Sequence, residues 1–365
     1  MDRLCITKRG WIQQASRQWP HLLAIIAALT VIVGCDSSEN ESEPEQTNVP
    51  ITFNSSVVSA LTHSSRGVPI TDTDQTALLS AGVYAYSTGA DNFNAATSKP
   101  DYMVNQLLSR TFDGNTPMDW TYSPSKYWPA AGNKLTFLAY SPHSTVCSGF
   151  TLTQEDGVAY PKMDFTVDSK IENQVDLLIA DPVVDCEKST GTVPLNMKHA
   201  LTLISFSAAV KNSSTSDMIK INKITVTNVL SAGNTPVKTP ITWSDLRTST
   251  SYVLSIENGT LTDSALTTTM SLLNTAKGFL LLMPQPFNDE QAKIIIEYSS
   301  ANGTEKIYEE QFFICYTEAV WQPGTAINYQ ILLNADKVEI TASITPWEKK
   351  YFNGGDKENG NLPWE

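Results

Sequence analysis

Apolar residues in this chain recur at every second position, in short runs that end at Gly, Pro, Asn or Ser. The clearest run spans 338–345, where Pro346 ends the pattern and one face carries only apolar side chains: Val338, Ile340, Ala342 and Ile344. Successive side chains of a strand point to opposite faces, so a period of two predicts half-buried β-strands. No long segment has the period of an amphipathic helix, because the apolar run 272–282 contains Gly278 and is followed by Pro284. The chain is therefore predicted to be all-β.

The predicted strands fall into two sets along the chain. The first set comprises 51–57, 83–86, 134–140 and 176–180, and the second comprises 199–206, 219–229, 252–256, 279–283, 293–298, 306–315, 327–333 and 338–345. The alternation slips once within 219–229, which predicts a bulge or a strand buried on both faces. Short strands at such spacings are typical of antiparallel β-sandwiches. We therefore expect two such domains in tandem, 50–195 and 196–347, and a polar C-terminal tail, 348–365.

The N-terminus has the features of an export signal. Lys8, Arg9 and Arg17 precede an apolar run, 22–33, that is too short to cross a hydrocarbon core of about 30 Å. This pattern predicts a signal peptide, 1–34. The sequence around Cys35 looks like a bacterial lipobox, with cleavage between Gly34 and Cys35 and lipid attached to the Cys35 sulfur, which would hold the protein at a membrane. The alternative is an ordinary signal peptide with a chance cysteine. Residues 35–49 are acidic and contain Pro44, which predicts a disordered tether.

Charge and cysteine content limit the function classes. Removal of residues 1–34, which carry a net charge of +3, takes the formal net charge from −13 to −16. Such an acidic chain repels phosphate backbones, so we expect no nucleic-acid partner. Cys5 leaves with the signal peptide and Cys35 carries the lipid, so Cys147, Cys186 and Cys315 remain; three cysteines form at most one disulfide, and buried free thiols are an equal alternative. Their spacing does not fit a zinc site.

Catalytic and cofactor motifs are not evident in the sequence. His63, His143 and His199 lie apart, and Asp72 and Asp74 lack the rest of a calcium loop. We expect no cofactor, no metal and no enzyme activity, although a carboxylate pair formed in space by a hydrolase would escape a reading of the sequence. The dense aromatic segment 120–129 has two interpretations. It is an exposed platform for a glycan, or it packs in a sandwich core.

Several segments together resemble one family. The segments are 120–129, 135–142, 176–180, 199–201, 282–285, 321–329 and 344–347, and they resemble the fimbrillins of Bacteroidota, which comprise type V pilins and fimbrillin-like surface lipoproteins. The resemblance implies two transthyretin-like antiparallel β-sandwich domains and no enzyme activity. It also implies lipid anchoring through Cys35 in the outer membrane, display at the cell surface and a role in adhesion. The acidic run after Cys35 is similar to a surface-export signal, and a plain solvated linker is the alternative.

The resemblance also implies a mode of assembly. An Arg-specific protease cuts near the first strand, and Arg66, followed by Gly67, matches the cleavage position and is the first Lys or Arg after Cys35. The released strand would carry Ile51, Phe53 and Val57, and a strand from another fimbrillin subunit would fill the groove. The run 338–344 is the candidate donor strand, or equally a fixed core strand. The polar tail is a poor donor, so a tip, anchor or accessory subunit stays open. An intact surface lipoprotein that binds glycan or a host ligand is the main alternative.

Overall fold

The computed structural model describes residues 48–57, 70, 75–114, 116–155, 157–212, 218–255, 262, 265–273, 279–302, 304–317, 319–334 and 337–346. All of them belong to one compact unit, and the structure is all-β, as the sequence predicts. The elements outside the three main sheets are the ribbon of β4 (Phe112–Asp113) and β5 (Thr116–Pro117) and the short 3-10 helices η1 (Ile171–Asn173), η2 (Lys188–Thr190) and η3 (Ile314–Thr317).

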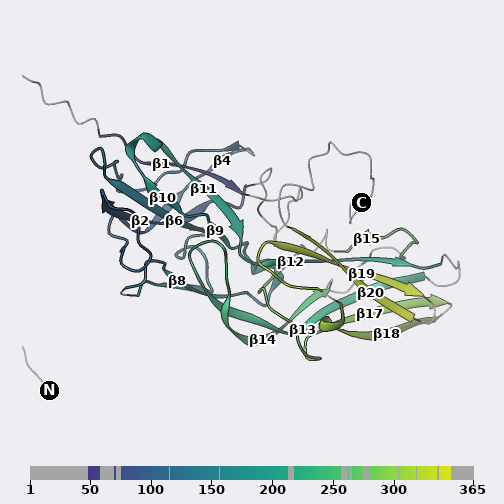
Figure 1. The fold of residues 1–365 in the computed structure, drawn as a ribbon. Coiled ribbons are helices and arrows are strands. Elements are labelled where there is room, and N and C mark those ends of the chain that lie inside the picture. Colours follow the sequence, from purple (N-terminus) through teal and green to yellow (C-terminus); the bar gives the residue numbers. More distant parts are fainter. Residues whose placement is uncertain are drawn as a thin grey trace, which may run out of the picture. The chain divides into compact units, whose positions relative to one another are not determined.

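Three sheets carry the fold (Figure 1). The first sheet has the order β1 (Thr52–Val57), β11 (Thr192–His199), β9 (Leu178–Ala180), β6 (Lys134–Ser141), β2 (Ser80–Gly89) and β3 (Met103–Ser109), and β10 (Val183–Cys186) also pairs with β6. The second has the order β15 (Ser271–Leu272), β12 (Thr202–Val210), β19 (Thr325–Asn334) and β20 (Lys337–Pro346), and β16 (Leu280–Leu282) pairs with β12. The third has the order β18 (Thr304–Phe313), β17 (Lys293–Asn302), β13 (Met218–Pro236), β8 (Lys162–Thr166) and β7 (Phe150–Thr153), and β14 (Ser244–Ser255) pairs with β13.

The central strands of the first sheet, β9, β6 and β2, are buried on both faces, which explains their nearly continuous apolar runs. Val83 and Phe137 pack in a smaller core, which also contains the side chains of β1 and β11. Tyr84 and Leu138, one position along, pack in a larger core together with strands of the other two sheets. Since neighbours in a strand face opposite ways, this sheet separates the two cores.

Two strand pairs run parallel, namely β1 with β11 and β12 with β19. The expectation of antiparallel sandwiches did not include them. Each pair joins strands that are far apart in the chain, and a parallel pair requires a long crossover. The other pairs in the three sheets are antiparallel.

The structure tests two details of the predicted strands: where the strand 199–206 begins, and whether 219–229 contains a bulge. The predicted strand 199–206 is confirmed from Thr202 onwards as part of β12, but its start is wrong, because His199 ends β11. At the break, the Gly324 N–H donates to the Leu201 carbonyl at 3.0 Å, a tertiary contact that alternation does not encode. The bulge predicted within 219–229 is confirmed, since the pairing of β13 with β17 shifts between Ile221 and Lys223.

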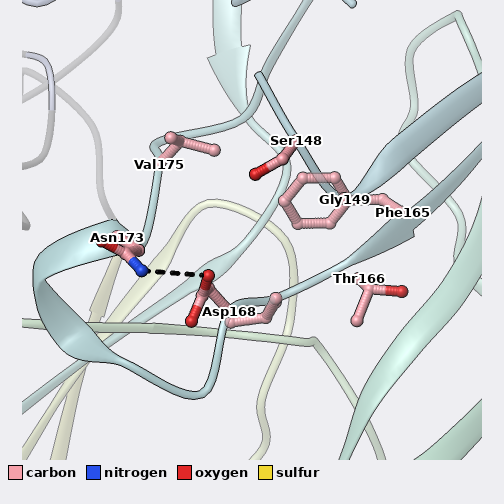
Figure 2. A pocket seen from close by; sticks show the side chains of 8 residues that line it. Ser148, Gly149, Phe165, Thr166, Asp168, Asn173 and Val175 are labelled. Carbon is pink, nitrogen blue, oxygen red and sulfur yellow. Dashed lines mark hydrogen bonds between the residues drawn. The ribbon is translucent and has the colours of Figure 1, made fainter.

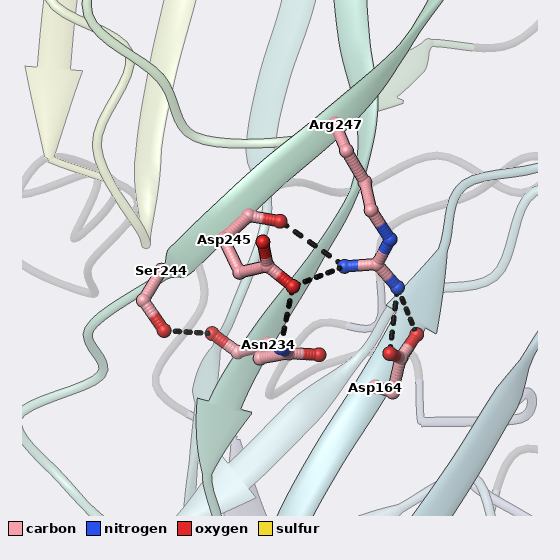
Figure 3. Close-up of polar contacts among 5 residues, drawn as sticks. All are labelled: Asp164, Asn234, Ser244, Asp245 and Arg247. Atoms are coloured by element: carbon pink, nitrogen blue, oxygen red, sulfur yellow. Dashed lines mark hydrogen bonds and ion pairs between the residues drawn. The ribbon is translucent and has the colours of Figure 1, made fainter.

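The third sheet joins segments from both predicted domains. Arg247 of β14 donates to both carboxylate oxygens of Asp164 on β8, at 2.6 Å each, across the intervening β13 (Figure 3). Arg247 and Asn234 both donate to Asp245 Oδ2, at 3.3 and 3.0 Å. The boundary near residue 195 falls inside β11, and the division into 50–195 and 196–347 stays a proposal.

Candidate functional site

β1 is an edge strand of the first sheet, and β11 is its neighbour in that sheet (Figure 1). The register pairs Thr52 with Thr192 and Val57 with Met197. Outward side chains add two bonds: the Thr52 and Thr192 hydroxyls lie 2.9 Å apart, and Ser56 donates to Asn196 Oδ1 at 3.0 Å. An edge strand is the kind of element that a strand from another chain can replace.

The inward side chains of this segment lie in the smaller core. Ile51, Phe53 and Val57 are buried there. The Phe53 ring meets Tyr122 edge-on at 5.7 Å and Phe137 at 5.8 Å between centroids. The prediction of a β1 strand with this apolar face is thus confirmed, whereas its removal in the cell is a separate proposal.

The aromatic segment covers the edge of β1. Tyr122 donates to the Ile51 carbonyl at 2.8 Å, and the Ile51 N–H donates to the Lys126 carbonyl at 2.9 Å. Trp120 and Trp128 are 8% and 6% exposed and pack in the smaller core. The core-packing interpretation is therefore confirmed for Trp120 and Trp128. An exposed aromatic platform formed by Trp120 and Trp128 is not present, and in that segment only Tyr127 is a large exposed aromatic.

Arg110 packs against Trp120 of the aromatic segment. The sequence did not predict this contact. The guanidinium carbon of Arg110 lies 4.5 Å from the Trp120 ring centroid, and its Nε donates to the Leu78 carbonyl at 2.8 Å. Burial lowers the pKa of the guanidinium to about 10. A lone Arg shortly before an aromatic-rich segment was the available signal.

The candidate donor strand forms part of the second sheet. β20 pairs with β19 from Thr325 opposite Pro346 to Asn334 opposite Lys337, and it is an edge strand. Val338 is buried, Ile340 and Ala342 are half-buried, and Ile344 is 44% exposed. The predicted half-buried strand is confirmed, and its use as a donor stays a proposal.

The other predicted site residues divide into two groups. Gly34, Cys35, Arg66 and Gly67 lie outside the described residues. Cys147, Cys186 and Cys315 are free thiols, and burial raises the pKa of Cys147 to about 11.

Alternative chemistries find little support in the described part of the chain. No His, Cys, Asp and Glu side chains gather there in a group of three that could hold a metal. Among those same residues no helix is long and apolar enough to cross a membrane. Asp176 is the one buried carboxylate in the described ranges, so they contain no buried carboxylate pair of the kind a hydrolase uses.

One small pocket lies between the β7–β8 hairpin and η1 (Figure 2). Its volume is about 120 Å³, and its lining includes Ser148, Phe165, Asp168 and Asn173. Asn173 donates to Asp168 Oδ2 at 3.3 Å, so these two polar side chains of the lining bind each other. Ligand pockets typically enclose roughly 300–1,000 Å³, so we assign no ligand to it.

Solved structures show where this fold has been seen before. The fold is similar to a fimbrial protein from Bacteroides vulgatus ATCC 8482, with a TM-score of 0.59 and 19% identity over 81% of this chain and 99% of that one. It is also similar to a protein from Bacteroides uniformis ATCC 8492 described as a candidate cell adhesion protein, with a TM-score of 0.51 and 12% identity over 82% and 99% of the two chains. The chain thus has an all-β fold of the kind seen in a fimbrial protein.

The family follows from the sequence. A family model for fimbrillin-like proteins matches residues 70–347, and the chain belongs to that family. The Fimbrium subunit Fim1C of Phocaeicola vulgatus (strain ATCC 8482) is 25% identical over 370 residues, covering 92% of this chain and 89% of that protein. The predicted resemblance is therefore confirmed.

Proposed function

We propose that this chain is a structural subunit of a fimbrium that serves adhesion at the cell surface. Membership of the fimbrillin-like family and the similarity to Fimbrium subunit Fim1C support this role. In the proposal the chain is exported as a lipoprotein, lipidated on Cys35 and anchored in the outer membrane. Cleavage between Arg66 and Gly67 then releases β1, and a strand from another fimbrillin subunit fills the vacated groove.

The observation that carries the proposal is the position of β1. It is an edge strand of its sheet, and just before it Ile51 and Val49 bond to the backbone of Lys126 and Trp128, so its departure breaks the ladder with β11 and these few bonds. Its apolar side chains lie in the smaller core, whereas the larger core lies beyond the first sheet and contains no residue of β1. The subunit can therefore lose β1 and keep most of its packing.

Loss of β1 leaves a groove that needs an occupant. Burial of Ile51, Phe53 and Val57 is worth roughly 1.5–3 kcal/mol for each side chain. Their departure would expose the walls formed by β11 and the aromatic segment together with the unpaired edge of β11. An open apolar edge aggregates unless it is filled, so cleavage and assembly are coupled in this mechanism.

The arginines of the mature chain favour a single cut. After Cys35 the sequence contains only Arg66, Arg110 and Arg247. Arg110 is buried, and Arg247 is bound to Asp164. The family match begins at Ile70, just beyond Arg66, so it leaves out the segment that the cut would release.

The test is limited digestion of the mature protein with an Arg-specific protease, followed by mass spectrometry and size-exclusion chromatography. We expect one cut, Gly67 as the new N-terminus, a folded product and growth into oligomers. The Arg66→Lys variant is the matched control, because it keeps the charge and removes the protease site. A resistant Arg66, or a cleaved protein that stays monomeric, would contradict the proposal and favour an intact surface lipoprotein that binds glycan or a host ligand.

A further inference from the structure

Arg247 lies in the least regular part of β14. Among the described strands β14 pairs only with β13, so its other edge has no described partner strand. The pairing of the two strands shifts between Ala232 and Asn234. Arg247 lies between Asp245 and Thr248, whose φ angles of 51° and 63° fall in the left-handed region that a β-branched residue rarely adopts. A strained and irregular edge strand separates from its sheet more readily than a central strand.

This segment has the features that an Arg-specific protease requires of a substrate. Such a protease binds the chain as an extended strand and takes the arginine side chain into a specificity pocket. An edge strand can provide the extended backbone. The Arg247 side chain is 36% exposed, so burial by itself does not exclude it from such a pocket. The single cut proposed at Arg66 therefore requires another form of protection at Arg247.

Two carboxylates hold the Arg247 side chain against the sheet (Figure 3). Nη2 donates to both oxygens of Asp164 at 2.6 Å each, and Nη1 donates to the Asp245 carbonyl and to Asp245 Oδ2 at 3.1 and 3.3 Å. Asn234 fixes Asp245 Oδ2 from the other side at 3.0 Å. Hydrogen bonds between charged groups are shorter and stronger than neutral ones. The guanidinium must break these bonds before it can enter a protease.

Asp164 comes from a distant part of the chain. It is 83 residues away from Arg247 and lies on β8, which pairs with β13 from Lys162 opposite Pro236 to Thr166 opposite Ala232. The carboxylate therefore reaches the guanidinium only when β8, β13 and β14 have come together. Protection of Arg247 depends on a complete third sheet, whereas the sequence around Arg247 is the same in a folded and an unfolded chain.

We infer that Arg247 is a second site for the processing protease, that the complete third sheet keeps it closed, and that Asp164 is the positioning residue that closes it. A chain whose third sheet is incomplete is then cut after Arg247 as well as after Arg66, whereas a complete subunit is cut once. This inference rests on the proposed processing at Arg66 and adds the reason why the folded subunit receives a single cut.

The test is digestion of the full mature chain with an Arg-specific protease in the Arg66→Lys background, where Arg110 and Arg247 are the remaining arginines. We expect the Arg66→Lys protein to stay intact. Addition of Asp164→Asn, which keeps the shape of the side chain and removes its charge, should speed cleavage between Arg247 and Thr248 by about fivefold or more. Mass spectrometry identifies Thr248 as the new N-terminus. Further addition of Arg247→Lys should abolish the cut.

Glu297→Gln in the same background is the matched control. It breaks the pair of Lys223 and Glu297, which lies in the same sheet, is similarly exposed and contains no arginine. We expect it to change cleavage after Arg247 by less than about twofold. Digestion in urea at concentrations that unfold the chain should cut after Arg247 in every variant that keeps this arginine. Resistance in urea would show that the bond is not a substrate and would overturn the second site.

The positions of the cuts separate local opening from general unfolding. Cleavage of the Asp164→Asn protein at Arg247 alone supports the inference, whereas cuts at Arg110 and Arg247 together would mean that the whole chain opens and would overturn the role of Asp164. Resistance of Arg247 in that variant would overturn it too, because pairing with β13 would then suffice. Cleavage there in the Arg66→Lys protein would show that the sheet leaves the site open. Resistance of Arg66 in the natural sequence contradicts the proposed function and is scored separately.

Discussion

Asp176 joins two distant segments through its two carboxylate oxygens. Oδ2 accepts a hydrogen bond from the Ile70 N–H at 2.7 Å, and Oδ1 lies 2.9 Å from His199 Nδ1. Both side chains of the Asp–His pair are 1% exposed. The pair therefore fastens the chain just downstream of Arg66 to the end of β11, and it would hold that point in place after β1 departs.

We expect Asp176→Ala to lower the free energy of unfolding by about 3–5 kcal/mol, because it leaves His199 and the Ile70 N–H without this buried partner. Urea unfolding followed by tryptophan fluorescence measures the change. Glu297→Ala, which breaks the partly exposed pair of Lys223 and Glu297, is the control and is expected to lose about 1 kcal/mol or less. Equal losses in the two variants would show that burial of the Asp–His pair is unimportant.

At the scale of the element, β1 and the second sheet, which contains β12 and β19, have separate packing partners. β1 contacts the smaller core, whereas β12 and β19 contribute to the larger one. Loss of an edge element should therefore act locally.

Hydrogen exchange before and after cleavage at Arg66 tests this separation. In the cleaved protein before it assembles, we expect faster exchange in β11, Thr192–His199, because its edge bonds to β1 are lost and the groove is still empty, and little change in β12 and β19. The Arg66→Lys protein treated with the same protease supplies the baseline. Faster exchange throughout β12 and β19 would mean that the two cores unfold together.

Sequence periodicity located most elements but little of their pairing. The alternation in 134–140, 327–333 and 338–345 reports which residues are apolar, and those runs are strands. Alternation does not indicate whether neighbouring strands run parallel or antiparallel, so the parallel pairing of β1 with β11 was not predicted. The break between β11 and β12 was missed because Leu201 and Leu203 keep the alternating pattern through a turn held by Gly324.

The candidate site shows the same limit. Burial of Ile51, Phe53 and Val57 was predicted from their spacing, since alternate residues of a strand lie on the same face. The wall around them was not predictable, because an aromatic-rich segment has the same composition whether it is exposed or buried. The contact of Trp120 with Ser55 and the packing of Arg110 against Trp120 join segments far apart in the chain, and neither has a local signature.

At the scale of the whole molecule, buried tyrosines set the alkaline limit of stability. Burial raises the pKa of Tyr329 to about 12 and also raises the pKa values of Tyr84, Tyr86, Tyr140 and Tyr252. The folded state holds protons that the unfolded chain releases near its ordinary pKa of about 10. This contribution is complete below about pH 10 and is lost as the pH rises towards 12.

We therefore expect the unfolding free energy to fall steeply between about pH 10 and 12, with tyrosinate absorbance rising in step with the loss of circular dichroism. Tyr329→Phe should flatten the alkaline limb while lowering stability at neutral pH, since Trp321 Nε1 donates to the Tyr329 hydroxyl at 2.9 Å. Tyrosinate that forms fully before the structure is lost would contradict this account.

The six-residue register of β1 beside β11 has a mechanical consequence. A strand paired there and pulled along its own axis is loaded in shear, so the hydrogen bonds of the ladder share the force and must break together. A strand peeled from one end would instead release them one at a time. In a fibre whose subunits are joined at this edge, tension along the strand meets the stronger of these two resistances, and a sideways pull meets the weaker.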